Sequence, residues 1–439
     1  MVQRKRLNKR PIGRLRGAQF HRPRGLDIVA LQVMLVALPW VRLEVYPRIT
    51  WADVAFAGAF GVFLGRALWT HKVPRPKTWV WGYGFLLLFW VMAVLFSGMN
   101  VPHVSPFLFD VAGLLYLSGM SWFLAYRVGN PQTLSRAWNA FLIGLWTCMA
   151  FGLVGIILGM QGTWPSWFYS HARKLTATFK YPNQLANFVA LFVPWLWGES
   201  MRADSTRRRL WYSLGLFLAL VEVLATGSRT GTVVALVGLA LSVGWSVLQG
   251  QRRSWIVGGS LLVGAMLVNW ISHSSFRVIR RSLTGISAVF TGQVTDAFRY
   301  HNWHLALDLF AQHILKGYGI ANIAVDYGYE IHNTYLAVLA DMGILGTLAF
   351  IFLVLYVTYL AWENVRWARV VPEWRGMAQG LLLGLLGELL FATQHLIYRE
   401  RHLWVWFAFV VALHAALKRT RMSYVWNHRR LDEEAGRTE

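Results

Sequence analysis

Basic side chains and one histidine are the residues of this sequence whose types and spacing could do chemistry. They fall in short stretches that separate long apolar runs. Cationic side chains bind a di-anion through charge-assisted hydrogen bonds, and an imidazole exchanges a proton near neutral pH. The candidates on this basis are Arg173, Lys174, Arg229, Arg277, Arg280, Arg281, Arg299 and His332.

Other reactive groupings are missing from the sequence. The run Gly227–Gly231 has Arg229 where a nucleophile elbow needs serine, and there is no Walker A loop and no H-E-x-x-H pair. Cys148 is the only cysteine, which excludes a disulfide and a cysteine-based zinc site. Carboxylates between the apolar runs are scattered, so the sequence predicts no Mg²⁺ or Mn²⁺ site and no cofactor.

The elements that must position these residues are membrane-spanning helices. Of the 439 residues, 56% are hydrophobic and only 14% are charged. The apolar runs are about 16–28 residues long, which is typical of membrane spans. We expect an all-α polytopic membrane protein with about twelve transmembrane helices, near 26–41, 51–69, 79–96, 107–125, 138–160, 184–198, 210–226, 230–248, 254–271, 333–361, 376–397 and 402–418.

Topology explains most of the formal charge of +23. With residues 1–25 inside and twelve spans, 30 of the 43 Lys and Arg residues fall on the cytoplasmic side, where they are normally enriched. We therefore expect no nucleic-acid partner, although the basic tail suits contact with anionic membrane lipid. The predicted organisation is a cytoplasmic tail 1–25, helices one to nine in 26–271, an outer helical loop in 272–332, helices ten to twelve in 333–418 and a cytoplasmic tail 419–439.

The outer segment 272–332 is too long to be structureless in a compact protein. Apolar residues recur at helical spacing in 276–290 and in 299–316, and glycines follow each stretch. We expect a helical hairpin that rests on the helix bundle or on the lipid interface. The loop leads directly to His332, which puts this imidazole at the outer membrane boundary.

Acids also occur inside the predicted spans, at Glu222, Asp341 and Glu388. Ionisable residues within a membrane are costly and are commonly functional. The alternative is a structural role, in which these acids pair with Arg229, Arg399 or Arg401. Each Lys or Arg residue of the outer loops also has a structural alternative, in which its side chain only extends from the end of a span to the membrane surface.

Four stretches occur in an order that is typical of one family. They are Lys174–Asn183, the Ser228–Gly231 turn, Arg299 and Trp303 followed by Gly317-Tyr318-Gly319, and His332-Asn333 followed by Gly343 and Gly346. This order resembles the O-antigen ligase and O-antigen polymerase superfamily. The sequence departs from the family pattern at Ala177, where glycine is usual, and before Gly317, where proline is usual.

The resemblance implies a glycosyltransferase of the bacterial inner membrane, with its active site facing the periplasm and both termini in the cytoplasm. Members of the family transfer glycans from undecaprenyl diphosphate without a nucleotide sugar or a metal. We expect a ligase that moves the glycan to a sugar hydroxyl of lipid A-core in lipopolysaccharide biosynthesis. An O-antigen or exopolysaccharide polymerase and a protein O-oligosaccharyltransferase would use the same donor, and a transporter of an anionic lipid is the alternative from another class.

In the expected reaction, Arg299 and other outer bases bind the diphosphate and stabilise its departure. His332 takes the proton from the acceptor hydroxyl as this attacks the anomeric carbon with inversion. The supporting residues are Asn183, Asn333 and Asp341, and the last two are candidates to orient the imidazole. The other expected ligands of the diphosphate are Arg229, Lys174, Arg173, Arg280, Arg281 and Arg277.

Overall fold

The computed structural model describes residues 25–46, 49–71, 78–99, 101–250, 257–259, 263–264 and 297–435. These residues are mainly helical, in agreement with the predicted all-α class. The sheet among them is a two-stranded antiparallel hairpin of β1 (Glu44–Tyr46) and β2 (Ile49–Thr50), which the sequence analysis did not predict.

The helices follow the apolar runs of the sequence. The first group consists of α1 (Leu26–Ala37), α2 (Trp51–Thr70), α3 (Thr78–Phe96), α4 (Val104–Val128), α5 (Pro131–Met160), α6 (Pro182–Arg202), α7 (Thr206–Ala225) and α8 (Arg229–Leu248). The second consists of α11 (Ala297–Gln312), α12 (Asn322–Tyr327), α13 (Thr334–Trp367), the 3₁₀ helix η2 (Pro372–Trp374), α14 (Arg375–Phe391) and α15 (Arg401–Ala435). Eleven predicted spans overlap these helices, and the remaining one, 254–271, lies mostly outside the described residues.

Six of the described helices are long and apolar enough to cross a membrane. They are α2, α4, α5, α8, α13 and, in α15, residues 401–420. Helix α1 and residues 80–96 of α3 are apolar but shorter. The chain is thus a helical membrane protein with several candidate spans, and the number twelve stays a prediction.

Small residues allow α6, α8 and α14 to pack closely. A Cβ atom added to Gly231 of α8 would lie 2.5 Å from the Cβ of Ala186 in α6. One added to Gly384 of α14 would lie 2.8 Å from the carbonyl oxygen of Leu191, also in α6. Both distances are well below van der Waals contact, so these helices can approach only because glycine lies between them.

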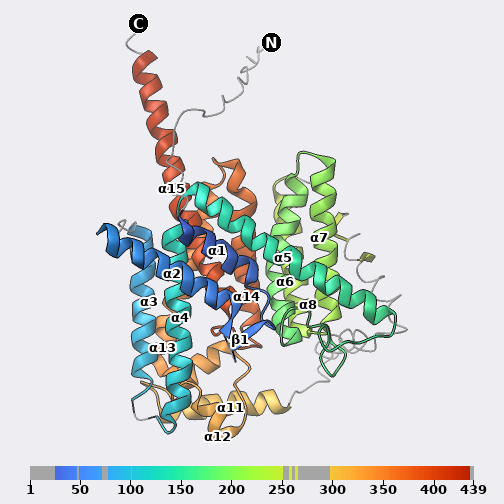
Figure 1. Ribbon diagram of the computed structural model, residues 1–439, viewed down its shortest axis with the longest axis vertical. Helices are drawn as coiled ribbons and strands as arrows, with labels where there is room; N and C mark the ends of the chain where they lie inside the picture. Colours follow the sequence, from blue (N-terminus) through green and yellow to red (C-terminus); the bar gives the residue numbers. More distant parts are fainter. Residues whose placement is uncertain are drawn as a thin grey trace.

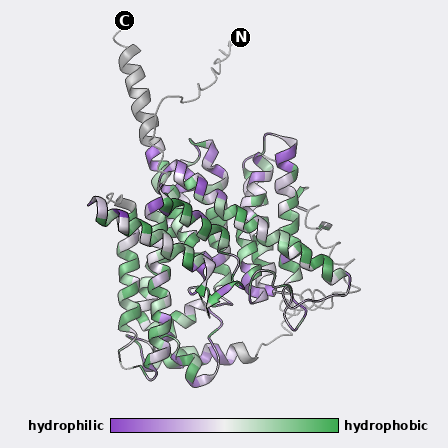
Figure 2. Cartoon of the chain, in the orientation of Figure 1, coloured by the Kyte–Doolittle hydropathy of each residue, from purple (hydrophilic) through white to green (hydrophobic). Residues whose placement is uncertain are grey.

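Helix α15 forms the centre of the bundle. Its residues 402–417 are all buried, and it contacts α4, α5, α13 and α14. Figure 1 shows α6, α7 and α8 as one group on the right, α3 and α4 on the left, and α5 running obliquely across the molecule. Hydrophobic residues dominate α3, α4 and α5, whereas hydrophilic ones gather where α7 begins (Figure 2).

The connections between helices gather at two opposite ends of the bundle. In Figure 1 the α6–α7 turn, η2 and the later part of α15 lie at the upper end. Helices α11 and α12 and the α3–α4 turn lie at the lower end, which we call the α11–α12 end. The segments predicted to be cytoplasmic, 199–209 and 362–375, therefore lie opposite α11. Which end faces the periplasm stays a prediction.

Part of the predicted outer loop can be compared with the structure. Helix α11 overlaps the predicted helical stretch 299–316, and α12 is a short helix that the sequence analysis did not predict. The stretch 276–290, with Arg277, Arg280 and Arg281, lies outside the described residues. Arg299 belongs to α11, but its side chain is also outside the described part of the chain.

Candidate functional site

His332 lies on the short turn that leads into α13. Its side chain is exposed, and Asn333 after it is the N-cap of the helix. The Oδ1 atom of Asn333 accepts hydrogen bonds from the backbone N–H groups of Tyr335 and Leu336 at 3.0 and 3.1 Å. Asn333 thus fixes the backbone beside His332 by capping α13, and its amide oxygen is engaged by the helix rather than by the imidazole.

The connection between α14 and α15, residues 392–400, lies against this turn. The backbone N–H of Thr334 donates to the carbonyl oxygen of Ala392 at 2.8 Å. Its hydroxyl donates to the carbonyl oxygen of His395 at 2.7 Å and accepts from the backbone N–H of Ile397 at 2.8 Å. As a result the imidazoles of His332 and His395 are neighbours, with 6.3 Å between their ring centroids.

Arg399, in the same connection, joins three segments of the chain. Its Nη1 donates to Oε1 of Glu330 at 2.9 Å, and its Nη2 lies 3.0 Å from Oδ2 of Asp110 in α4. The guanidinium also lies over the ring of Tyr398, 5.4 Å from the ring centroid. Burial alone would lower the pKa of Arg399, but Tyr398 and the surrounding carboxylates raise it above its ordinary value, so Arg399 stays a cation.

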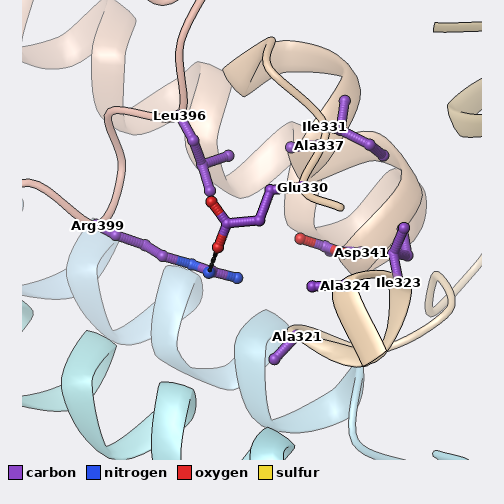
Figure 3. Close-up of a pocket in the computed structure, with 9 residues that line it drawn as sticks. All are labelled: Ala321, Ile323, Ala324, Glu330, Ile331, Ala337, Asp341, Leu396 and Arg399. Carbon is purple, nitrogen blue, oxygen red and sulfur yellow. Dashed lines mark hydrogen bonds and ion pairs between the residues drawn. The ribbon is translucent and has the colours of Figure 1, made fainter. Parts of the chain in front are cut away.

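A small cavity lies beside this ion-pair network. Figure 3 shows Glu330 and Arg399 joined by their ion pair, with Asp341 close by at the cavity wall. Its volume of about 10 Å³ is room for about one water molecule. The phenol of Tyr398 donates to Oδ2 of Asp341 at 3.0 Å, so this buried carboxylate also has a partner on the 392–400 connection. The cavity is too small for a sugar or a diphosphate.

Helix α13 is interrupted at Gly343, which has φ 62° and ψ −161°. The break leaves backbone carbonyl groups of α13 without their partners within the helix, and the segment after α11 supplies hydrogen-bond donors for them. The backbone N–H groups of Tyr318 and Gly319 donate to the carbonyl oxygens of Ala340 and Asp341 at 2.8 and 2.9 Å. Irregular backbone within a membrane protein is stable where such partners exist. Two of the four stretches that carry the family resemblance therefore meet in space.

The buried acid of α14 has partners other than the arginines that the sequence suggested. Glu388 accepts a hydrogen bond from Nδ2 of Asn187 at 3.0 Å and lies 3.2 Å from Nε2 of His402. Arg401 instead binds Asp53 of α2, at 2.7 and 2.8 Å. The expected pairing of Glu388 with an arginine is therefore wrong, because the neighbouring helices bring an amide and an imidazole to it.

Glu222 of α7 is another buried acid. Neither of its carboxylate oxygens has a hydrogen-bond partner among the described residues. It faces α5, where a Cβ added to Gly152 would lie 2.5 Å from its Oε1. A pair between Glu222 and Arg229 is thus not seen in the part of the chain that the structure describes.

Arg229 and Asn183 occupy neighbouring helix starts. Arg229 is the exposed first residue of α8, and the N-cap Ser228 accepts from the backbone N–H of Gly231 at 3.2 Å. Asn183 is in the first turn of α6, just before Ala186, which packs against Gly231. The two polar residues therefore share one end of the α6–α8 pair.

The segment that carries Arg173 and Lys174 is attached to the same region. The backbone N–H of Leu175 donates to the carbonyl oxygen of Ala225 at 3.1 Å, just before the turn that begins α8. The guanidinium of Arg173 lies over the ring of Trp164, 5.6 Å from its centroid. The structure thus brings the two basic stretches predicted from the sequence next to each other.

Arg42 fixes this segment, although the sequence analysis did not select it. Its guanidinium donates to the carbonyl oxygens of Ser166 and Phe179 at 2.5 and 2.7 Å, and to Oγ1 of Thr176 at 2.6 Å. Burial lowers the pKa of the Arg42 side chain. No local pattern signals this role, because the bonded residues are 124 to 137 positions apart.

The α3–α4 turn is fastened to α12 on the exposed surface. Nε2 of His103 lies 2.6 Å from Oδ1 of Asp326, and the phenol of Tyr318 donates to Oδ2 of Asp326 at 2.6 Å. The hydrogen bond from Tyr318, followed by the one with His103, lowers the pKa of Asp326, and the same contact raises the pKa of Tyr318 to about 12. These contacts link the α3–α4 turn to α12 and to the segment that follows α11.

Comparison with known proteins finds a family match in the central part of the chain. Residues 214–351 match the family model described as O-Antigen ligase, and they contain Arg229, Arg299, His332 and the break at Gly343. Over this segment the chain is similar to the O-antigen ligase family. A curated O-antigen ligase of Pseudomonas aeruginosa is 27% identical over 169 residues, which make up 37% of this chain and 38% of that protein.

The match over residues 214–351 confirms the resemblance for the three stretches that lie within it. Ala177, where the family usually has glycine, adopts φ 43°, a left-handed conformation that favours glycine. The glycine that is usual in the family therefore suits the backbone at this position. Arg173, Lys174 and Asn183 precede the matched segment, so the match does not bear on the roles predicted for them.

Proposed function

We propose that this chain is a glycan ligase, which moves a glycan from undecaprenyl diphosphate to a sugar hydroxyl of a lipid A-core acceptor at the periplasmic face of the inner membrane. The observation that carries the proposal is the exposed imidazole of His332 at the start of α13, within the same family segment as Arg229 and Arg299. An exposed base within the same family segment as cationic residues suits a reaction in which a hydroxyl attacks and an anion leaves.

The diphosphate is bound by arginine and lysine. Arg229 supplies a cation at the start of α8, and the Arg173–Lys174 stretch lies near it through the hydrogen bond from Leu175 to Ala225. The matched segment also contains Arg299 of α11. Arg277, Arg280 and Arg281 precede α11 in the chain and complete the proposed set. Fixed cations contribute most when negative charge develops on the leaving diphosphate.

His332 acts as the general base. The acceptor oxygen forms a bond to the anomeric carbon while the bond from this carbon to the diphosphate oxygen breaks. The acceptor proton goes to the imidazole, and the bonding electron pair leaves with undecaprenyl diphosphate, so a single displacement inverts the anomeric centre. Asn333 supports this step by fixing the helix start, and Asp341 supports it through Tyr398 on the 392–400 connection.

The test is an assay of purified protein with lipid-linked glycan and lipid A-core. We expect the glycan on the core acceptor for the wild type, about 10²–10⁴-fold lower turnover for His332→Gln, and donor binding close to wild type in that variant. Near wild-type turnover of His332→Gln would end the general-base proposal.

The product also decides between the acceptors. Repeats added to another lipid-linked glycan would mean a polymerase, and glycan on serine or threonine of a protein would mean a protein O-oligosaccharyltransferase. Either product would contradict the lipid A-core acceptor while leaving the donor site in place. Passage of the intact lipid-linked glycan across the membrane, without any product, would instead mean a transporter.

A further inference from the structure

The turn that carries His332 is held from both sides by the 392–400 connection. On the C-terminal side, Thr334 makes three hydrogen bonds to backbone groups of this connection. On the N-terminal side, the carboxylate of Glu330 is bound by Arg399 at 2.9 Å. His332 lies between these two attachments and its own side chain stays exposed.

Arg399 is itself rigidly placed. Its second nitrogen lies 3.0 Å from Asp110 of α4, and the guanidinium lies over Tyr398, whose hydroxyl binds Asp341 of α13. The side chain of Asp110 is 14% exposed and that of Arg399 25% exposed. A charge in such surroundings is stabilised by its partners, and removing one partner leaves the others uncompensated.

The adjacent cavity supports a positioning role rather than a binding role. It has room for about one water molecule, and the two terminal nitrogens of Arg399 are already bound to Glu330 and Asp110. Figure 3 shows Arg399 joined to Glu330 with Asp341 close by, and Glu330 lies two residues before His332 in the chain.

We propose that Arg399 is a positioning residue, which holds the 330–334 turn through Glu330 and so fixes the imidazole of His332 for proton transfer. This inference rests on the proposed function of His332. Arg399 acts on the rate of the chemical step and not on donor binding, because its contacts among the described residues are with Glu330, Asp110 and Tyr398.

A spin label tests the positioning without any assay of catalysis. His332→Cys in a Cys148→Ala background gives one reactive cysteine for a nitroxide, since Cys148 is the only native cysteine and is buried. We expect a broad, immobilised spectrum that sharpens in both Arg399→Leu and Glu330→Gln. The matched control is Arg401→Gln, which breaks the ion pair with Asp53 next to the same connection. A spectrum that stays equally broad in Arg399→Leu and Glu330→Gln would overturn the inference.

Kinetics of the same variants give the second readout. Arg399→Leu and Glu330→Gln should each lower kcat by about 10- to 100-fold with little change in the KM for donor, since small misplacements of a reacting group have effects of this size. The double variant should be no worse than the poorer single variant, because both act through one contact. Arg399→Lys should recover part of the activity.

The two readouts separate failure of this inference from failure of the proposed function. An active His332→Gln enzyme would reject the general base, while the spectra would still decide whether Arg399 holds the turn. An inactive His332→Gln enzyme with additive losses from Arg399→Leu and Glu330→Gln would reject only the positioning role.

Discussion

At the scale of single residues, Arg229 is the proposed diphosphate ligand whose surroundings are best described. It begins α8, where backbone N–H groups at the helix start also favour an anion. Its side chain is exposed and Ser228 fixes the backbone beside it, so a substitution should leave the fold intact.

We expect Arg229→Ala to lower kcat/KM for the lipid-linked donor by about 10- to 100-fold, the size expected when a hydrogen bond to a charged group is lost. Arg229→Lys should restore only part of this loss, because lysine lacks the bidentate fork. The control is Arg207→Ala, which removes an exposed arginine from the opposite end of the bundle and should have little effect. Full activity of Arg229→Ala would show that this arginine is only an interfacial anchor.

At the scale of elements, the break in α13 determines how the segment after α11 meets the membrane helices. A Cβ added to Gly343 would lie 2.6 Å from the carbonyl group of Leu315, and one added to Gly317 would lie 2.4 Å from the backbone of Asp341. Both glycines also have positive φ values, of 62° and 72°. Backbone meets backbone at this contact, so neither side can move aside as a flexible side chain would.

We expect Gly343→Ala and Gly317→Ala each to destabilise the protein by about 2 kcal/mol or more, since they combine backbone strain with steric overlap. The thermal unfolding midpoint of the detergent-solubilised protein measures this. The matched control is Gly328→Ala, which has a similar φ of 76° but no atom within 4 Å of the added Cβ. Equal losses in all three variants would mean that φ alone matters and that the close contact does not.

At the scale of the whole molecule, the bundle separates its connections into two ends. The α6–α7 turn lies at one end, and α11 and α12 lie at the other (Figure 1). The positive-inside pattern predicts that the first of these ends is cytoplasmic and that the second faces the periplasm.

Labelling of single cysteines with a membrane-impermeant reagent tests this orientation. In intact cells we expect His171→Cys and Tyr327→Cys to react, and Asp204→Cys to react only after permeabilisation. All three positions are exposed, and the buried Cys148 should stay silent throughout. Reaction of Asp204→Cys in intact cells would reverse the predicted topology.

The sequence by itself determined the helical class, most of the helix positions and the resemblance to one family. Apolar runs and their glycine and proline boundaries are local properties, so α4, α8 and α13 appear close to where the sequence predicts them. The family resemblance likewise depends on residue types and their order, and the match over 214–351 confirms it. The bonding partners of charged residues were harder to predict, as Glu388 shows.

Only the tertiary structure decided which charged groups meet. Arg401 binds Asp53 across 348 positions, and Arg42 binds Phe179 across 137. Arg399 reaches Glu330 and Asp110 only because α4, α13 and the 392–400 connection pack together. Each side chain takes the nearest opposite charge that folding provides, and spacing along the chain does not encode this distance. Helix formation depends on local sequence, whereas ion pairing depends on how the helices pack.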